Sequence, residues 1–162
     1  MVAAPRGSAT MPCTRLLVLL LSRSATAQLS SLVASHSGPC VVNTVTNCVC
    51  SSNFDGAGEC DASSAVPGKD YGSSESCRVD FTRSVTLTKH LFETESGGYY
   101  SGCYDYVELE GTEYCTGRAN DAQGDALHGI TTSTFGWQSD GSVTARGFKI
   151  CFWAPGLPPS PP

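Results

Sequence analysis

Nine cysteines are distributed along the 162 residues of this chain. Such a density is typical of small secreted proteins whose folds are held by disulfides, because a reducing cytosol does not preserve the bridges. Cys48 and Cys50 have no second pair of cysteines or histidines at zinc-finger spacing, which favours disulfides over a structural metal site. We therefore expect one extracellular, disulfide-stabilised domain with short appendages.

The N-terminus has the layout of a secretory signal peptide over residues 1–27. Arg6 and Arg15 precede the apolar run LLVLLL, and Ala25-Thr26-Ala27 offers a cleavage site between small residues. The run is too short to cross a bilayer, which takes about 20 residues. Cleavage removes three of the ten Lys and Arg residues and none of the fifteen acids. The acidic mature chain, with eight cysteines left for four bridges, disfavours nucleic acid and anionic membranes as partners.

After the leader, apolar and polar residues alternate at the two-residue period of β-strands. The apolar residues of YDYVELE (104–110) face one way and its glutamates the other, and the same period places Val85, Leu87 and Leu91 on one face. No segment carries a long apolar stripe at helical spacing. These patterns predict an all-β fold, an antiparallel β-sandwich. The other expected strands are residues 77–82, 84–92, 129–137 and 142–152.

Two segments flank these strands. Residues 28–59 hold three cysteines without helical period and are expected to form an irregular lead-in tied down by disulfides. Residues 154–162 contain five prolines, which cannot continue a sheet and predict an extended tail.

Five short motifs occur in order between Cys60 and Trp153. Together with their cysteines they resemble the CUB domain, an extracellular β-sandwich of jelly-roll type, and imply a CUB-like domain over residues 60–153. Cys151, inside the last expected strand, is an addition to that pattern. The motifs are VPGKDYGSSESC (66–77), VTLTKHLFETE (85–95), CYDYVELEG (103–111), EYCTG (113–117) and WQSDGSVTARGF (137–148).

The resemblance also implies part of the disulfide pattern. It pairs Cys60 with Cys77 and Cys103 with Cys115. The lead-in would then be tied to the last strand through Cys151, with the pairing among Cys40, Cys48, Cys50 and Cys151 left open. A competing similarity, of CVCSSNFDGAGEC (48–60) to the second half of an epidermal-growth-factor-like module, would pair Cys60 with Cys50 instead.

Many CUB domains bind one calcium ion at one end of the sandwich. By match to the family's motifs, the resemblance implies three carboxylate ligands, Glu95, Asp105 and Asp140. Ser142, through its side chain or carbonyl, and the carbonyl of Val143 would complete the shell. Glu93 is an alternative to Glu95.

The positions of the three acids support calcium on separate grounds. Each falls where the chain is expected to change direction, and calcium needs six to eight hard oxygen ligands, which loops supply more readily than strands. Three carboxylates placed together repel one another without a cation. An extracellular site of this kind binds at about 10⁻⁴ to 10⁻³ M.

The expected function is a secreted, calcium-dependent protein-interaction or adhesion module. Spare oxygens of Glu95 and Asp105 would accept basic side chains of an extracellular partner, and Tyr99 and Tyr100 are candidates for exposed contacts. We expect no catalytic activity, since neither a G-x-S-x-G nor an H-E-x-x-H motif occurs. The alternatives are a carbohydrate-binding module that uses the tyrosine-rich loop and a non-catalytic appendage of a longer extracellular enzyme.

Overall fold

A computed structural model describes residues 32–54, 60, 69–95, 97, 102–116 and 126–155. The expected signal peptide, Tyr99, Tyr100 and the tail from residue 156 onward lie outside this part. None of the described residues belongs to a helix of the length and apolarity that a bilayer crossing requires.

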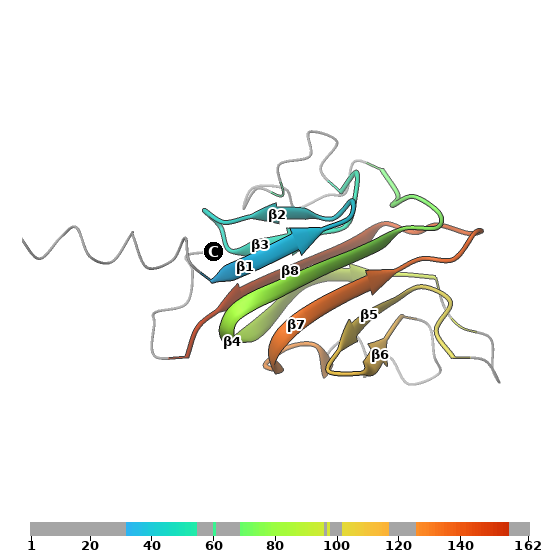
Figure 1. The fold of residues 1–162 in the computed structure, drawn as a ribbon. Coiled ribbons are helices and arrows are strands. Elements are labelled where there is room, and N and C mark those ends of the chain that lie inside the picture. The colour runs from blue at the N-terminus through green and yellow to red at the C-terminus, as the bar shows by residue number, and fades with distance from the viewer. Residues whose placement is uncertain are drawn as a thin grey trace, which may run out of the picture.

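The described chain is built from eight antiparallel strands joined in one sheet (Figure 1). The strands follow the order β2-β3-β8-β4-β7-β5-β6, and β1 pairs with β4 beside this path. The all-β prediction is therefore confirmed. The strands are β1 (Val33–Ser37), β2 (Val41–Asn43), β3 (Cys48–Cys50), β4 (Ser76–Glu93), β5 (Tyr106–Leu109), β6 (Thr112–Tyr114), β7 (Thr131–Gln138) and β8 (Gly147–Trp153).

The long strand β4 gives the sheet two layers. Its first half pairs with β1 and β7, and its second half pairs with β8, while β7 also reaches Val85 and Thr86 just beyond the bend. Between the halves, residues 82–84 are exposed, and the register with β7 shifts between Asp80 and Val85. Figure 1 shows β4 turning back there. Residues 77–82 and 84–92, expected as two strands, are thus one bent strand that begins and ends at the same end of the molecule.

The core lies between the two layers. β7 and β8 are not hydrogen-bonded neighbours, yet the ring of Phe148 on β8 lies 5.5 Å from Phe135 and 5.0 Å from Trp137, both on β7. Phe81 and Phe152 meet similarly at 4.9 Å. All five side chains are buried. Aromatic packing of this kind holds the layers together by removing large apolar surfaces from water.

A β-bulge changes which residues of β4 enter the core. The pairing of β4 with β8 shifts register between Lys89 and Leu91, so one extra residue, His90, stands in the strand. The shift reverses the faces beyond it, and Phe92 is buried while Leu91 is only partly buried. The prediction that Leu91 shares a face with Val85 and Leu87 is wrong for this reason.

The lead-in is more regular than expected. It supplies β1, β2 and β3, which pair with β4 and β8, so residues 33–50 belong to the same sheet as the rest. Three disulfides tie this segment to its surroundings, in agreement with the expectation that it is disulfide-bonded.

The pairing of the cysteines corrects one prediction. Cys103 and Cys115 are bonded as the resemblance implies, but Cys60 is bonded to Cys50 and not to Cys77. Cys77 is instead bonded to Cys40, with 5.8 Å between the Cα atoms, because β1 runs along the start of β4 and delivers Cys40 there.

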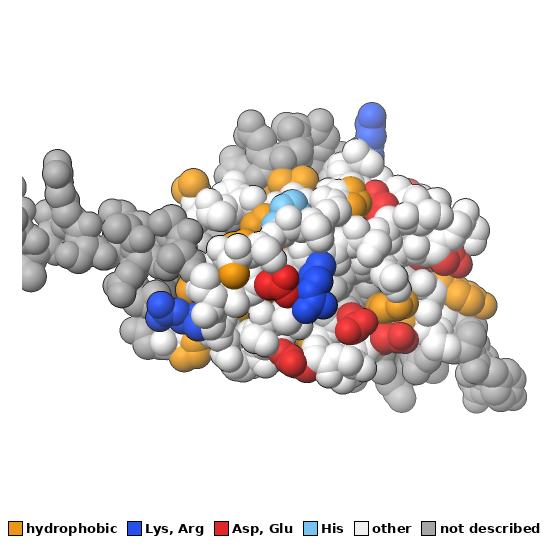
Figure 2. All heavy atoms as spheres, in the orientation of Figure 1, with side chains coloured by type: hydrophobic (Ala, Val, Ile, Leu, Met, Phe, Trp, Pro, Cys, Tyr) orange, Lys and Arg blue, Asp and Glu red, His pale blue; other side chains and the backbone are white. Residues whose placement is uncertain are grey.

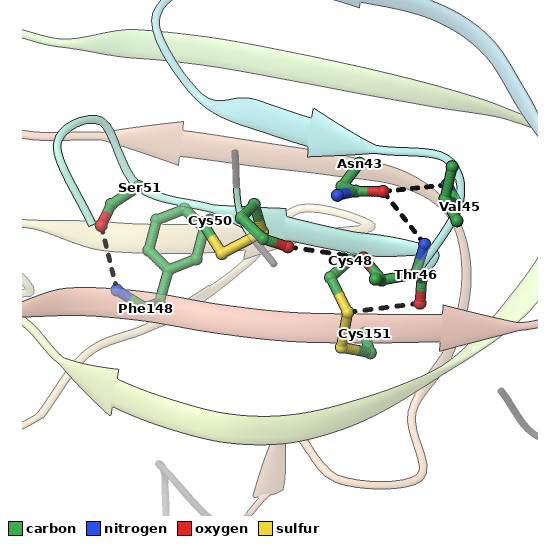
Figure 3. The surroundings of a disulfide bond; sticks show 9 residues. Asn43, Val45, Thr46, Cys48, Cys50, Ser51, Phe148 and Cys151 are labelled. Carbon is green, nitrogen blue, oxygen red and sulfur yellow. Dashed lines mark hydrogen bonds between the residues drawn. A yellow bond between two sulfur atoms is a disulfide. The ribbon is translucent and has the colours of Figure 1, made fainter. Parts of the chain in front are cut away.

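The fourth bridge joins the lead-in to the last strand, as expected. Cys48 on β3 lies directly opposite Cys151 on β8 in the pairing of the two strands, and the two are bonded (Figure 3). The same strand pair is closed at its other end by the Phe148 backbone N–H, which donates to the Ser51 hydroxyl.

Candidate metal centre

Three carboxylates converge at the end of the sheet where β4 both begins and ends. Glu95 follows β4 by two residues, Asp105 directly precedes β5, and Asp140 follows β7 by two residues. One ligand oxygen from each lies within 4.8 Å of the others. The bend in β4 is what allows this, because it returns the chain to the edge at which β5 starts and β7 ends.

Asp105 is the buried centre of the cluster, with 0% of the residue exposed. Its Oδ2 accepts a hydrogen bond from the Tyr71 hydroxyl at 2.5 Å, and its Oδ1 accepts from the Asp140 backbone N–H at 2.7 Å. The Tyr71 hydroxyl also accepts from the Glu95 backbone N–H at 2.9 Å. One tyrosine therefore positions two of the three acidic segments relative to each other.

Asp140 is held by its own loop. Its Oδ1 accepts from the backbone N–H and the hydroxyl of Ser142, at 2.8 and 3.2 Å, and its carbonyl accepts from the Ser74 N–H. Ser142 thus lies against the Asp140 carboxylate. Val143 follows in the same loop and is 62% exposed.

The electrostatics of the cluster disfavour three ionised carboxylates. Burial raises the pKa of Glu95, and the charges of Asp140 and Asp105 raise it further. Burial also raises the pKa of Asp105, despite the hydrogen bonds from Tyr71 and Asp140 that stabilise its charged form. The pKa of Tyr71 is raised too, mainly by burial, so its hydroxyl remains a neutral donor. A bound cation would offset the repulsion.

The donor set fits a hard cation. All three side chains offer carboxylate oxygens, the ligand type that calcium and magnesium prefer, and the cluster contains neither His nor Cys. The Glu95 Oε2 atom is buried and has no hydrogen-bond partner in the described part of the chain. A buried carboxylate oxygen without a donor is costly, and coordination to a metal would satisfy it.

The structure also separates Glu95 from its alternative. Glu93 Oε1 accepts a charged hydrogen bond from Arg146 at 2.9 Å, while Glu95 lies in the cluster. Glu95 is therefore the glutamate that the fold offers to a metal.

Two residues at this site were not singled out from the sequence for any role. Tyr71 is one, although its motif contributed to the CUB resemblance. Glu75 is the other: its carboxylate accepts from the Gly72 N–H at 2.8 Å, from the Trp137 indole at 3.2 Å and from the Ser52 hydroxyl. These bonds attach the loop that contains Tyr71 both to β7, through Trp137, and to the lead-in, through Ser52.

The same loop is fastened to the Asp140 loop by Ser139. Its N–H donates to the Glu75 carbonyl, and its hydroxyl both donates to the Gly72 carbonyl and accepts from the Glu75 N–H. These bonds join residues that are far apart in sequence, and no local sequence signal marks them as partners.

The residues expected to contact a partner are only partly placed. Glu95 and Asp105 lie in the cluster, whereas Tyr99 and Tyr100 are outside the described residues. Tyr104, next to Asp105, is 43% exposed.

Comparison of the chain with protein-family models, with curated proteins and with solved structures finds no match in any of the three.

Proposed function

We propose that this chain is a secreted, calcium-dependent protein-interaction module of CUB-like type without catalytic activity. The observation that carries the proposal is the convergence of Glu95, Asp105 and Asp140, from three separate segments, on a partly buried point. The four disulfides fit an extracellular protein, where millimolar calcium would fill a site of moderate affinity.

Calcium would be held by the three carboxylates, with oxygens of Ser142 and Val143 as further proposed ligands. When bound, the ion would supply positive charge that cancels the repulsion among the acids. The residues of the chain do the positioning: Tyr71 orients Asp105 and the Glu95 backbone, and Ser142 orients Asp140.

The proposed partner is an extracellular protein that presents Lys or Arg side chains. Carboxylate oxygens left over from coordination accept such groups as charge-assisted hydrogen bonds. Exposed Tyr104 and Val143, which flank two of the acids in sequence, would add apolar contact area around them.

The proposal is tested by melting the purified protein with calcium and with EDTA. The parent is expected to melt at a higher temperature in calcium, because an ion that binds only the folded state stabilises it. Asp105→Ala and Asp140→Ala are expected to lose this increase and still to be secreted. Glu113→Ala, an exposed acid on β6, is the matched control and should respond like the parent. If the two variants respond to calcium as the parent does, the site is wrongly assigned.

A further inference from the structure

We infer that the outer face of the sheet carries a second binding site, a polar groove that receives one neutral pyranose ring of a glycan. The groove crosses the first half of β4, β7 and β5 on the side away from the core and has a volume of about 150 Å³. Figure 2 shows this face, where basic and acidic side chains lie close together over these strands. Its lining includes none of the three carboxylates Glu95, Asp105 and Asp140.

The groove exists because β7 has no side chain at its middle position. Gly136 lies directly opposite Arg78 on β4 and Glu108 on β5. With strands about 4.8 Å apart, the backbones that carry Arg78 and Glu108 are roughly 9.5 Å apart, and nothing but the Gly136 backbone lies between them. A Cβ added at Gly136 would lie 3.4 Å from the Glu108 Cβ, so a larger side chain would fill the slot.

The walls carry hydrogen-bonding groups that the described protein leaves unused. Arg78 donates through Nε to Asp80 at 2.9 Å, which leaves its terminal NH₂ groups for a ligand. The Glu108 carboxylate has no hydrogen bond or ion pair within the described residues, although it lines the groove. Thr134 adds a hydroxyl on the same floor. These groups include both donors and acceptors, and they are fixed on strands and not on loops.

One end of the groove is formed by an aromatic ring. Tyr106 is half-buried, and its hydroxyl donates to the Gln138 side-chain oxygen, which fixes the ring at the groove edge. An aromatic face beside planar polar side chains suits a sugar, whose C–H groups pack on a ring while its hydroxyls bind around the rim.

The charges and the size select the occupant. Asp80 already pairs with Arg78, but the terminal NH₂ groups of Arg78 disfavour a cationic ring and the Glu108 carboxylate disfavours an anionic one, so the slot favours a neutral ligand. A hydroxyl both donates and accepts, and neighbouring sugar hydroxyls can therefore meet the guanidinium and the carboxylate at once. The volume is below the usual range for sites that enclose a whole ligand, so a single ring would enter while the rest of the glycan stays in solvent.

The test is saturation-transfer NMR on the full chain in EDTA, which removes any contribution from the proposed calcium site. The probes are methyl α-D-mannopyranoside, methyl β-D-galactopyranoside and N-acetyl-D-glucosamine. At least one is expected to bind the parent with a dissociation constant on the order of 1 mM, as a shallow polar site allows. Gly136→Val, which fills the slot with a good strand former, should abolish the signal.

Two further variants keep the result interpretable. Thr131→Val alters an exposed position on the same strand outside the groove and should bind like the parent. Glu108→Gln keeps the shape of the wall, is expected to fold normally, and should weaken binding about tenfold by removing a charged acceptor.

Three outcomes would overturn the inference. One is that no probe binds the parent, and another is that Gly136→Val binds as well as the parent does. The third concerns a lysine-rich decapeptide, run as a fourth probe: if it binds the parent in a Glu108-dependent way and no sugar does, the face is a protein-binding surface and the sugar assignment is wrong.

Discussion

The hydroxyl of Tyr71 makes hydrogen bonds to two of the three acidic segments of the candidate metal centre. It donates to the Asp105 carboxylate and accepts from the Glu95 backbone N–H. Tyr71→Phe keeps the ring that packs edge-on against Trp137 at 4.9 Å but removes both bonds. A hydrogen bond to a charged group contributes about 1.5–3 kcal/mol, so calcium affinity should fall at least about tenfold.

The measurement is a calcium titration of the purified variant followed by melting temperature. Tyr106→Phe is the matched control, because its hydroxyl bonds to Gln138 on the outer face and not to the cluster. Equal calcium affinities in parent and Tyr71→Phe would show that Tyr71 does not position the ligands.

The raised pKa values of Glu95 and Asp105 predict a pH dependence. Because both pKa values lie above the ordinary 4.5 and 3.8, protonation stabilises the metal-free fold, and this stabilisation is lost as the pH rises through the raised values. Calcium needs both groups ionised. The calcium-dependent increase in melting temperature should therefore be full at neutral pH and shrink as the pH falls through the raised pKa values.

Melting curves in EDTA and in calcium across this range check the pH prediction. Asp105→Asn should flatten the EDTA curve, since it removes one of the two titrating groups. An increase in melting temperature that is equally large at neutral pH and below the ordinary carboxyl values would contradict the involvement of these residues.

The three acidic residues could be predicted from the sequence, but the residues that position them could not. Glu95, Asp105 and Asp140 stand in motifs, and the fold brings those residues together. The partners of Tyr71 lie 24 and 34 residues away in the chain, and only the tertiary fold makes them neighbours.

Among the strands, β4 determines where the candidate metal centre forms, because its bend brings both of its ends to the same edge of the sheet. The alternation of residues predicted the strand over Tyr106–Leu109 well, because one face is buried and the other is solvated. It did not predict that one strand serves both layers of the sheet, since the bend is recognised only from pairing with β7 and β8.

Gly147 at the start of β8 offers a test at the level of the element. Its φ is +90°, and an added Cβ would lie 2.0 Å from the Ser51 hydroxyl oxygen, which accepts from the Phe148 N–H. Gly147→Ala should therefore disrupt the packing of Ser51, which follows β3, against the start of β8. It should also strain the backbone at residue 147. Gly111→Ala is the matched control, with φ +80° and nothing within 4 Å of the new Cβ.

Urea unfolding should show Gly147→Ala less stable than Gly111→Ala by about 2 kcal/mol, the cost of the lost contact beyond the shared strain. If the two variants are equally stable, the close contact between Ser51 and Gly147 contributes little to the stability of the fold.

For the whole molecule, the disulfides define how the lead-in is joined to the sheet. Four bridges among the eight cysteines that follow the expected leader were predictable from the sequence, and the tie through Cys151 and the Cys103–Cys115 bridge followed from the resemblance. The Cys40–Cys77 bridge was not predictable, because it depends on the pairing of β1 with β4, which the composition of the lead-in does not indicate.

The lengths of the closed loops predict how much two of these bridges contribute. Cys48 and Cys151 are 103 residues apart, and Cys50 and Cys60 only 10. In the chain-entropy account, removing the first bridge should cost about 2 kcal/mol more than removing the second. Urea unfolding of the two double-alanine variants measures the difference, and a larger loss for Cys50 and Cys60 would contradict it.

Equilibrium dialysis against radioactive calcium at neutral pH measures whether one ion binds to the three carboxylates. The parent is expected to bind one calcium ion per chain with a dissociation constant of about 10⁻⁴ to 10⁻³ M. Asp105→Asn should bind none, and Glu113→Gln, which makes the same charge change on exposed β6, should bind like the parent. A parent that binds no calcium, or an Asp105→Asn variant that binds as much as the parent, would contradict a calcium site at these carboxylates.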